Sequence, residues 1–394
     1  MAATFILLSI GIPWLGALLV WWVGDQHPRI QHTLAVVFSV LAGAAALALI
    51  PNAATAAAVT FPVGGLFGDF TFIPDGLGVF LAAVATVVGS LAVIFSVNYM
   101  HGEHQLGRYY AMVLFFIGAM VGLVLTSNLL LVFVFWEITA LCSYALISFH
   151  NDDPKAVKGG IKALIITHIG GVGLLAGALL VYSYFGTYDL NYFIANAGTL
   201  PAGVLAAAAF GFLIAAAAKS AQFPFQTWLP DAMEAPTPIS ALIHAATMVN
   251  AGVYLLARFY PAFKDVPGWT TAVVIVGMLS ALLAALMACV ATDLKRVLAY
   301  STVSQLGYMV YAIGAGGVFA SQFHLFSHSV FKALLFLAAG AVIHAVGTRD
   351  MRQMGALGKQ MPFVRAVFVI GALALAGLPI LYGFWSKELV LEAG

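Results

Sequence analysis

Two histidines and a lysine recur at intervals of four residues in one apolar stretch of the chain. They are His324, His328 and Lys332, in the run FHLFSHSVFKALLFLAAGAVIHA. A helix turns about 100° per residue, so this spacing places all three on one helical face, about 6 Å apart along the axis. Imidazoles and a buried amine can exchange protons near neutral pH. The spacing therefore predicts that His324, His328 and Lys332 form a path for proton transfer along the helix, a proton ladder.

A histidine pair four residues apart is also a metal-binding pattern. No acidic ligand or cysteine accompanies this pair, and the HExxH pattern is absent. The two cysteines, Cys142 and Cys289, lie in apolar stretches without CxxC spacing, and there is no P-loop or Rossmann fingerprint. We therefore expect neither a metal site nor a cofactor-binding site in this chain.

Three further charges interrupt apolar runs, where each costs about 2.5 to 3.5 kcal/mol on insertion scales. Glu137 lies midway along LLLVFVFWEITALCSYALISF. It is either a carboxylate paired with a buried base or an acid hydrogen-bonded to a neighbouring helix. Lys219, in AAAAKSAQFPFQTWLPD, precedes Pro224 and Pro230. Because proline frees backbone carbonyls, this pattern predicts a broken helix with a lysine at the break, although snorkelling to the interface would also explain the lysine.

The third charge repeats this pattern near the end of the sequence. Lys387 follows Gly377 and Pro379 in GLPILYGFWSKELVL, and an interfacial lysine is its alternative explanation. His244, in ISALIHAATMVNAGVYLL, is either a relay residue or a hydrogen-bonded core histidine. Asp293, Lys295 and Arg296, in TDLKRVLAYSTVSQLGYM, are expected to lie at the cytoplasmic end of a span, where they set topology.

The composition predicts an all-α polytopic membrane protein. Of 394 residues, 63% are hydrophobic and 8% are charged, against about 25% charged in soluble domains. About twelve apolar runs are long enough to span a bilayer and too long and continuous for a β-barrel. They begin near Thr4, Thr33, Gly76, Tyr110, Asn128, Gly160, Gly203, Ile239, Thr270, Arg296, Ser321 and Arg365. The first is expected to be a membrane helix rather than a cleaved signal, and residues 61–80 a short external hairpin or an irregular loop.

Basic residues predict the orientation. Most lie in loops after odd-numbered spans: Arg29, Arg108, Lys155, Lys158, Lys162, Lys295, Arg296, Arg349, Arg352, Lys359 and Arg365. Arg258 and Lys264 are exceptions. The positive-inside rule then places the N-terminus outside the cell or organelle matrix. The net charge of +1 gives no reason to expect a nucleic-acid partner.

Together these motifs resemble the antiporter-like membrane subunits of respiratory complex I, especially the large distal chain L or subunit 5 type. Related subunits occur in Mrp antiporters, membrane-bound hydrogenases and carbon-concentrating complexes. The resemblance covers nearly the whole chain, and PTPISALIHAATMV is a highly specific part of it. It implies three N-terminal helices in residues 1–100, a first five-helix repeat in 101–260, and an inverted, incomplete second repeat in 261–394.

The resemblance also implies residue roles. Glu137 and Lys219 match an ion pair and channel lysine, and His244 a connecting residue. His324, His328 and Lys332 match a central hydrophilic axis, and Lys387 the outlet. The sequence departs from the family pattern in ITHIGGVGLL, where Gly171 replaces an acid and His168 an arginine. Glu137 is then expected to be the sole counter-charge of Lys219. The sequence also stops inside the second broken helix, so we expect a fragment or a partner that supplies the remainder.

The leading functional hypothesis is a proton-translocating subunit of a redox-driven NADH:quinone oxidoreductase of complex I type. Such a chain would be a translocase subunit without redox chemistry of its own, in a bacterial or archaeal plasma membrane or an organelle inner membrane. NADH, FMN, Fe–S clusters and quinone would belong to partner subunits. The alternatives are an Mrp-type cation/proton antiporter subunit, a membrane subunit of an inorganic-carbon accumulation complex, and a structural scaffold.

Overall fold

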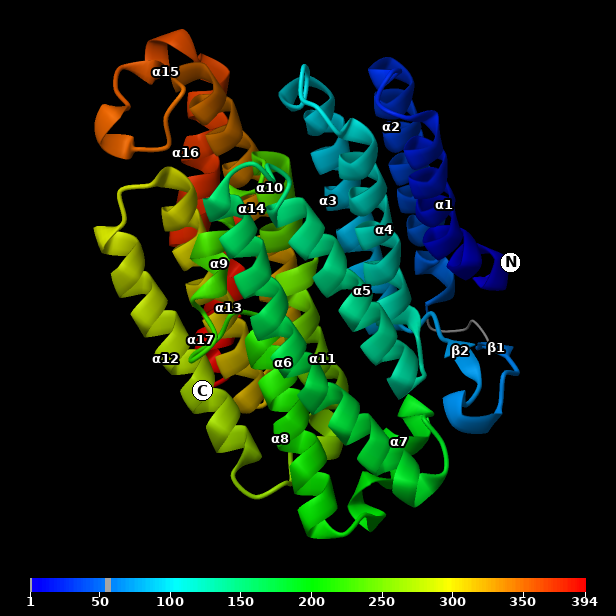
Figure 1. Cartoon of the computed structure of the whole chain (residues 1–394). Coiled ribbons are helices and arrows are strands. Elements are labelled where there is room, and N and C mark those ends of the chain that lie inside the picture. The colour runs from blue at the N-terminus through cyan, green and yellow to red at the C-terminus, as the bar shows by residue number, and fades with distance from the viewer. Residues whose placement is uncertain (1, 54–57) are drawn as a thin grey trace. The chain divides into compact units, whose positions relative to one another are not determined.

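The computed structural model describes residues 2–53 and 58–394, and helices make up most of them (Figure 1). Within these residues, ten segments are helical, long and apolar enough to cross a membrane. They are α1 (Ala2–Val23), α2 (Pro28–Leu47), α3 (Gly76–Tyr99), α4 (Leu106–Leu125), α5 (Leu129–Ile147), α6 (Pro154–Phe185), α8 (Ala202–Lys219), α10 (Thr237–Ala245) together with α11 (Met248–Phe263), α12 (Trp269–Val290) and α14 (Val318–Val346).

The two other apolar runs also form helices. They are α13 (Leu294–Gly314), which is more polar, and α16 (Pro362–Ala376), which is shorter. Each predicted run therefore corresponds to a helix, and the all-α membrane class is confirmed. The remaining elements are short: η1 (Ile50–Asn52), η2 (Gly65–Phe67), α7 (Leu190–Asn196), η3 (Ala197–Thr199), α9 (Trp228–Asp231), η4 (Ala232–Glu234), η5 (Met351–Gln353), α15 (Leu357–Gln360) and α17 (Tyr382–Glu392).

The segment before α3 is a hairpin rather than an irregular loop. Strands β1 (Val59–Phe61) and β2 (Phe70–Phe72) pair antiparallel, with Thr60 opposite Thr71. The side chain of Asp75 then accepts a hydrogen bond from the Gly78 backbone N–H at 2.8 Å and caps α3.

The chain forms two compact units that interleave along the sequence. The first comprises Met1–Leu146, Thr167–Ala215 and Pro261–Pro267; the second comprises Ile147–Ile166, Ala216–Tyr260 and Gly268–Gly394. These units do not follow the boundaries 1–100, 101–260 and 261–394, which divide the sequence by repeats rather than by contacts. The repeat division stays a prediction.

Small residues allow close helix packing inside each unit. In the first unit, Gly173 of α6 faces Gly211 of α8, and a Cβ on Gly173 would come within 2.6 Å of the Gly211 carbonyl oxygen. In the second unit, Gly307 of α13 packs against α12, where a Cβ would come within 2.6 Å of the Ala281 nitrogen. Such contacts are typical of membrane helices, because close backbone approach replaces the hydrophobic driving force.

Helix α8 ends at Lys219, as the lysine–proline pattern predicted. Ala221 adopts a left-handed conformation with φ of 50°, and helical structure resumes only at α9. Pro224 lies in this interruption and Pro230 lies within the short α9. A second interruption separates α16 from α17, where Gly377 has φ of 86° and Pro379 follows.

A third interruption lies between α10 and α11, within a run that the sequence analysis treated as one span. The Thr247 hydroxyl donates a hydrogen bond to the Leu242 carbonyl at 2.7 Å there. His244 consequently lies in the last turn of α10, beside this interruption.

Candidate functional site

The acidic residue of the first unit has a histidine partner. Glu137 lies on α5, and its Oε2 is 2.6 Å from Nδ1 of His168 on α6. The Glu137 side chain is only 16% exposed, whereas that of His168 is 59% exposed. A protonated His168 donates this hydrogen bond to the carboxylate, so the pair combines two groups that can each gain or lose a proton.

Gly171 makes room for the same carboxylate. It lies three residues after His168 on α6, and a Cβ added at this position would overlap Glu137 Oε1. The expectation that Glu137 is the sole counter-charge of Lys219 did not consider that Glu137 also pairs with His168, which the sequence analysis noted only as a replacement for arginine. The spacing of His168 and Gly171 was the signal that could have revealed this pairing, since residues three apart lie on the same helical face. The pairing of Glu137 with Lys219 stays a prediction.

Lys219 is fully buried at the end of α8, which disfavours snorkelling to the interface. The break that follows it is stabilised by polar side chains. Trp228 Nε1 donates to the Ala218 carbonyl at 2.9 Å, and Gln222 Nε2 donates to the Ser220 carbonyl at 2.9 Å. These bonds satisfy carbonyls that the end of the helix exposes, as an interruption at membrane depth requires.

The predicted ladder on α14 is fully buried in the second unit. His324 has a side-chain partner on each side: its Nδ1 is 2.9 Å from Ser386 Oγ, and its Nε2 is 3.1 Å from Gln305 Oε1. At the other end, Lys332 Nζ donates to the Leu298 carbonyl at 2.9 Å and to Ser301 Oγ at 2.5 Å. Between them, neither ring nitrogen of His328 has a hydrogen-bond partner among the described residues.

His244 connects this ladder to a buried lysine that the sequence analysis assigned to topology. Its ring stacks on Phe336 of α14 with 5.1 Å between the ring centroids, and Lys332 and Lys295 lie close enough to interact with it electrostatically. Lys295 is only 3% exposed, and its Nζ donates to the Ala235 carbonyl at 2.5 Å. Lys295 is therefore covered by other parts of the protein rather than exposed, while its placement at the cytoplasmic end of a span stays a prediction.

Lys387 lies at the other end of the ladder. Its Nζ donates to the Leu375 carbonyl, which α16 leaves free where it ends, and its aliphatic chain packs against Gly377. It lies close enough to interact electrostatically with both His324 and Lys332. The second unit thus brings together six protonatable groups from four helices: His244, Lys295, His324, His328, Lys332 and Lys387.

Charged residues at the start of α13 form an ion-pair network. Arg349 contacts Glu234 Oε1 at 2.9 Å and Asp293 Oδ2 at 3.1 Å, while Asp293 also caps α13 through the Arg296 backbone N–H. Burial alone would lower the pKa of Arg349, but the hydrogen bond to Glu234 and the charge of Asp293 outweigh it and raise that pKa. The guanidinium stays charged and joins three segments of the unit.

Replacing Arg349 with alanine should destabilise this network. The side chain is 31% exposed, so we expect a loss of about 1 to 2 kcal/mol in unfolding free energy, less than for a fully buried pair. Thermal unfolding of the detergent-solubilised protein measures this. Arg352→Ala is the matched control, because Arg352 is 72% exposed and pairs with Asp350, two residues away; equal melting of the two variants would contradict a structural role for Arg349.

Metal ligands do not cluster in the part of the chain that the structure describes. No group of three or more His, Cys, Asp or Glu side chains lies close enough there to hold an ion. The histidines of α14 instead face serine, glutamine and phenylalanine side chains.

Comparisons with known proteins give a consistent family assignment. A family model described as NADH:quinone oxidoreductase/Mrp antiporter, TM, matches residues 126–394. A second, described as NADH-Ubiquinone oxidoreductase (complex I), chain 5 N-terminus, matches residues 61–110.

Two curated relatives show the same similarity. NAD(P)H-quinone oxidoreductase chain 5 of Synechocystis sp. is 42% identical over 343 residues, which cover 83% of this chain and 50% of the relative. Na⁺/H⁺ antiporter subunit A1 of Staphylococcus aureus is 41% identical over 341 residues, covering 82% of this chain and 43% of the relative. The chain therefore spans about half the length of these relatives.

Solved structures agree in fold. A chain of the Mrp complex from Dietzia sp. superposes with a TM-score of 0.92 and 34% identity, covering 100% of this chain and 43% of that one. A chain of the membrane-bound sulfane sulfur reductase, an archaeal respiratory membrane complex, gives a TM-score of 0.87 and 27% identity, covering 98% and 81%.

Proposed function

Because the chain belongs to the NADH:quinone oxidoreductase/Mrp antiporter family of integral, multi-pass membrane proteins, we propose that it moves protons within a larger membrane assembly. Specifically, we propose a proton-translocating subunit of a redox-driven complex I-type NADH (or related donor):quinone oxidoreductase. The observation that carries this proposal is the buried cluster of six protonatable side chains in the second unit.

The roles of the cluster follow from its hydrogen bonds. Lys332 and Lys387 each donate to a backbone carbonyl, which holds the amine in place in either protonation state. His328 lies between Lys332 and His324 on one helical face, and both of its ring nitrogens are available to exchange a proton. A proton would pass from Lys295 through His244 and Lys332 to the α14 histidines, and leave through Lys387.

Glu137 and His168 would form a switching pair in our proposal, and Lys219 would be a further protonatable group of the relay. His168 supplies a cation only while it is protonated, unlike the arginine expected from the family pattern. The Glu137 carboxylate would therefore be released when His168 loses its proton. Lys219, at the end of a broken helix, would take up or release a proton as the channel lysine that the family resemblance implies.

Partner subunits would complete the assembly. They would hold NADH, FMN, the Fe–S clusters and quinone. In our proposal the N-terminus of this chain lies outside, and the loops after its odd-numbered spans face the opposite, inner side of the membrane. An Mrp-type cation/proton antiporter subunit is the second candidate, supported by the antiporter relative and by the replacement of an acid with Gly171.

Lys219→Ala tests the proposal in the purified assembly, reconstituted into liposomes. We expect fewer protons moved per electron pair when a donor and quinone are supplied, because the variant lacks the switchable amine. Lys264→Ala is the matched control, since Lys264 is exposed and outside the cluster. An unchanged proton-to-electron ratio in Lys219→Ala would overturn the proposal, and sodium flux in the unaltered assembly without any donor would favour the antiporter.

A further inference from the structure

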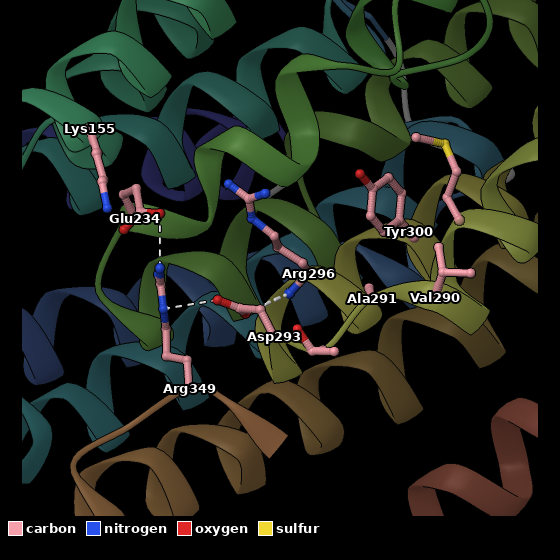
Figure 2. Close-up of a pocket in the computed structure, with 10 residues that line it drawn as sticks. Lys155, Glu234, Val290, Ala291, Asp293, Arg296, Tyr300 and Arg349 are labelled. Carbon is pink, nitrogen blue, oxygen red and sulfur yellow. Dashed lines mark hydrogen bonds and ion pairs between the residues drawn. The ribbon is translucent and has the colours of Figure 1, made fainter. Parts of the chain in front are cut away.

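A cavity of about 470 Å³ opens where α12 ends and α13 begins (Figure 2). Its lining includes three basic residues, Lys155, Arg296 and Arg349, and two acidic ones, Glu234 and Asp293. All five belong to the second unit, and none is in the proposed proton relay. The cavity is therefore a polar site beside Lys295, lined by residues that are not themselves in the relay.

The charges in this cavity are not balanced. Arg349 engages both carboxylates, and Figure 2 shows its guanidinium between Glu234 and Asp293. Arg296 has a carboxylate neighbour in Asp231, at a distance of 3.7 Å. That carboxylate also pairs with Lys162, at the shorter distance of 2.7 Å. Lys155 forms no ion pair within the described part of the chain. Arg296 and Lys155 thus leave positive charge for an anionic ligand, and a guanidinium can bind phosphate oxygens in a bidentate manner.

The other wall of the cavity is apolar and continues along a membrane helix. Met287, Val290 and Ala291 contribute this wall at the end of α12. Upstream, α12 exposes large apolar side chains at intervals of three or four residues, which form one stripe: Ile275, Met278, Leu282, Leu286 and Val290. A ligand that suits both walls carries an anionic head and a hydrocarbon tail.

We propose that this cavity binds the headgroup phosphate of an anionic phospholipid, with an acyl chain lying along the exposed stripe of α12. Arg296 and Lys155 contact the phosphate. Arg349 fixes the shape of the site by pairing with Glu234 and Asp293. The position suits a phospholipid, because the end of a membrane-spanning helix lies at the depth of the headgroups. The proposal does not depend on proton transfer by the chain.

The experiment titrates delipidated, purified assembly with dioleoyl phosphatidylglycerol and counts bound lipid by native mass spectrometry. In Lys155→Gln/Arg296→Gln, we expect the affinity for this lipid to fall roughly fivefold for each cation removed. Lys158→Gln/Lys264→Gln is the matched control, because it removes the same charge from exposed positions outside the cavity, and it should bind as the unaltered protein does.

Two further arms separate the lipid from other anions. Phosphatidylcholine, whose headgroup carries no net charge, should bind more weakly than phosphatidylglycerol. Its affinity should be the same for the double variant and the unaltered protein. Excess inorganic phosphate should not displace phosphatidylglycerol, because it lacks the chain that contacts α12. Equal phosphatidylglycerol binding by the double variant and the unaltered protein, or displacement by phosphate alone, would overturn the proposal.

Discussion

Replacing Gly171 with valine should displace the Glu137 carboxylate from His168 and stop proton transfer at this pair. A Cβ at position 171 overlaps Glu137 Oε1, and the two methyl groups of valine add bulk that a helix holds in one rotamer. The carboxylate must then leave the position from which it is 2.6 Å from His168. We expect an overpacking cost of about 1 to 3 kcal/mol in unfolding free energy, and proton flux reduced on the order of a hundredfold.

Two comparisons identify the cause of that loss. Gly11→Val is the control for valine in a membrane helix, because a Cβ at Gly11 of α1 meets nothing within 4 Å; it should leave flux and melting nearly unchanged. His168→Gln keeps a hydrogen-bond donor near Glu137 but removes the titrating ring. It should lose flux without the overpacking cost. Normal proton flux in Gly171→Val would show that the Glu137–His168 pair has no part in transport.

Local features of the fold could be predicted because they depend on short segments. Helix length follows from hydropathy, and both lysine-containing breaks follow from glycine and proline near Lys219 and Lys387. The shared face of His324 and Lys332 likewise follows from spacing alone. The interruption between α10 and α11 has no proline or glycine in it, so the sequence offered no comparable signal.

Partners across helices could not be predicted, since they depend on tertiary packing. Glu137 and His168 are 31 residues apart in sequence, and Ser386 is 62 residues from His324, so spacing on one helix cannot reveal either contact. The burial of Lys295 could not be predicted for a related reason. A lysine beside an aspartate and an arginine at the start of a span is typical of a membrane surface, and only the fold shows that its amine reaches the Ala235 carbonyl.

The two lysines at helix breaks point to a common physical device. A broken helix exposes carbonyls at membrane depth, and a lysine amine can donate to them whether it is charged or neutral. Lys387 does so with the Leu375 carbonyl, and the break after Lys219 is held by Trp228 and Gln222. At Lys387 a backbone carbonyl accepts the hydrogen bond of the amine. We expect such an amine to change protonation state more easily than one held in a permanent ion pair.

Lys332→Met should have the second large effect, a loss of proton flux without a loss of folding. Methionine fills a similar volume but carries no proton, so transfer between His244 and the α14 histidines should fall on the order of a hundredfold. Stability should change little or rise, because the substitution removes a fully buried amine whose desolvation is costly. Proton flux in reconstituted liposomes and melting of the solubilised assembly measure the two effects.

Lys332→Arg separates a proton carrier from a fixed charge. Arginine can still donate hydrogen bonds toward the Leu298 carbonyl and Ser301, yet its guanidinium does not release a proton in proteins. If Lys332 carries protons, the arginine variant should fail in transport as the methionine variant does, whereas Lys264→Met, at an exposed position, should transport normally. If Lys332 only supplies positive charge to the cluster, the arginine variant should transport normally, which would contradict its place in the relay.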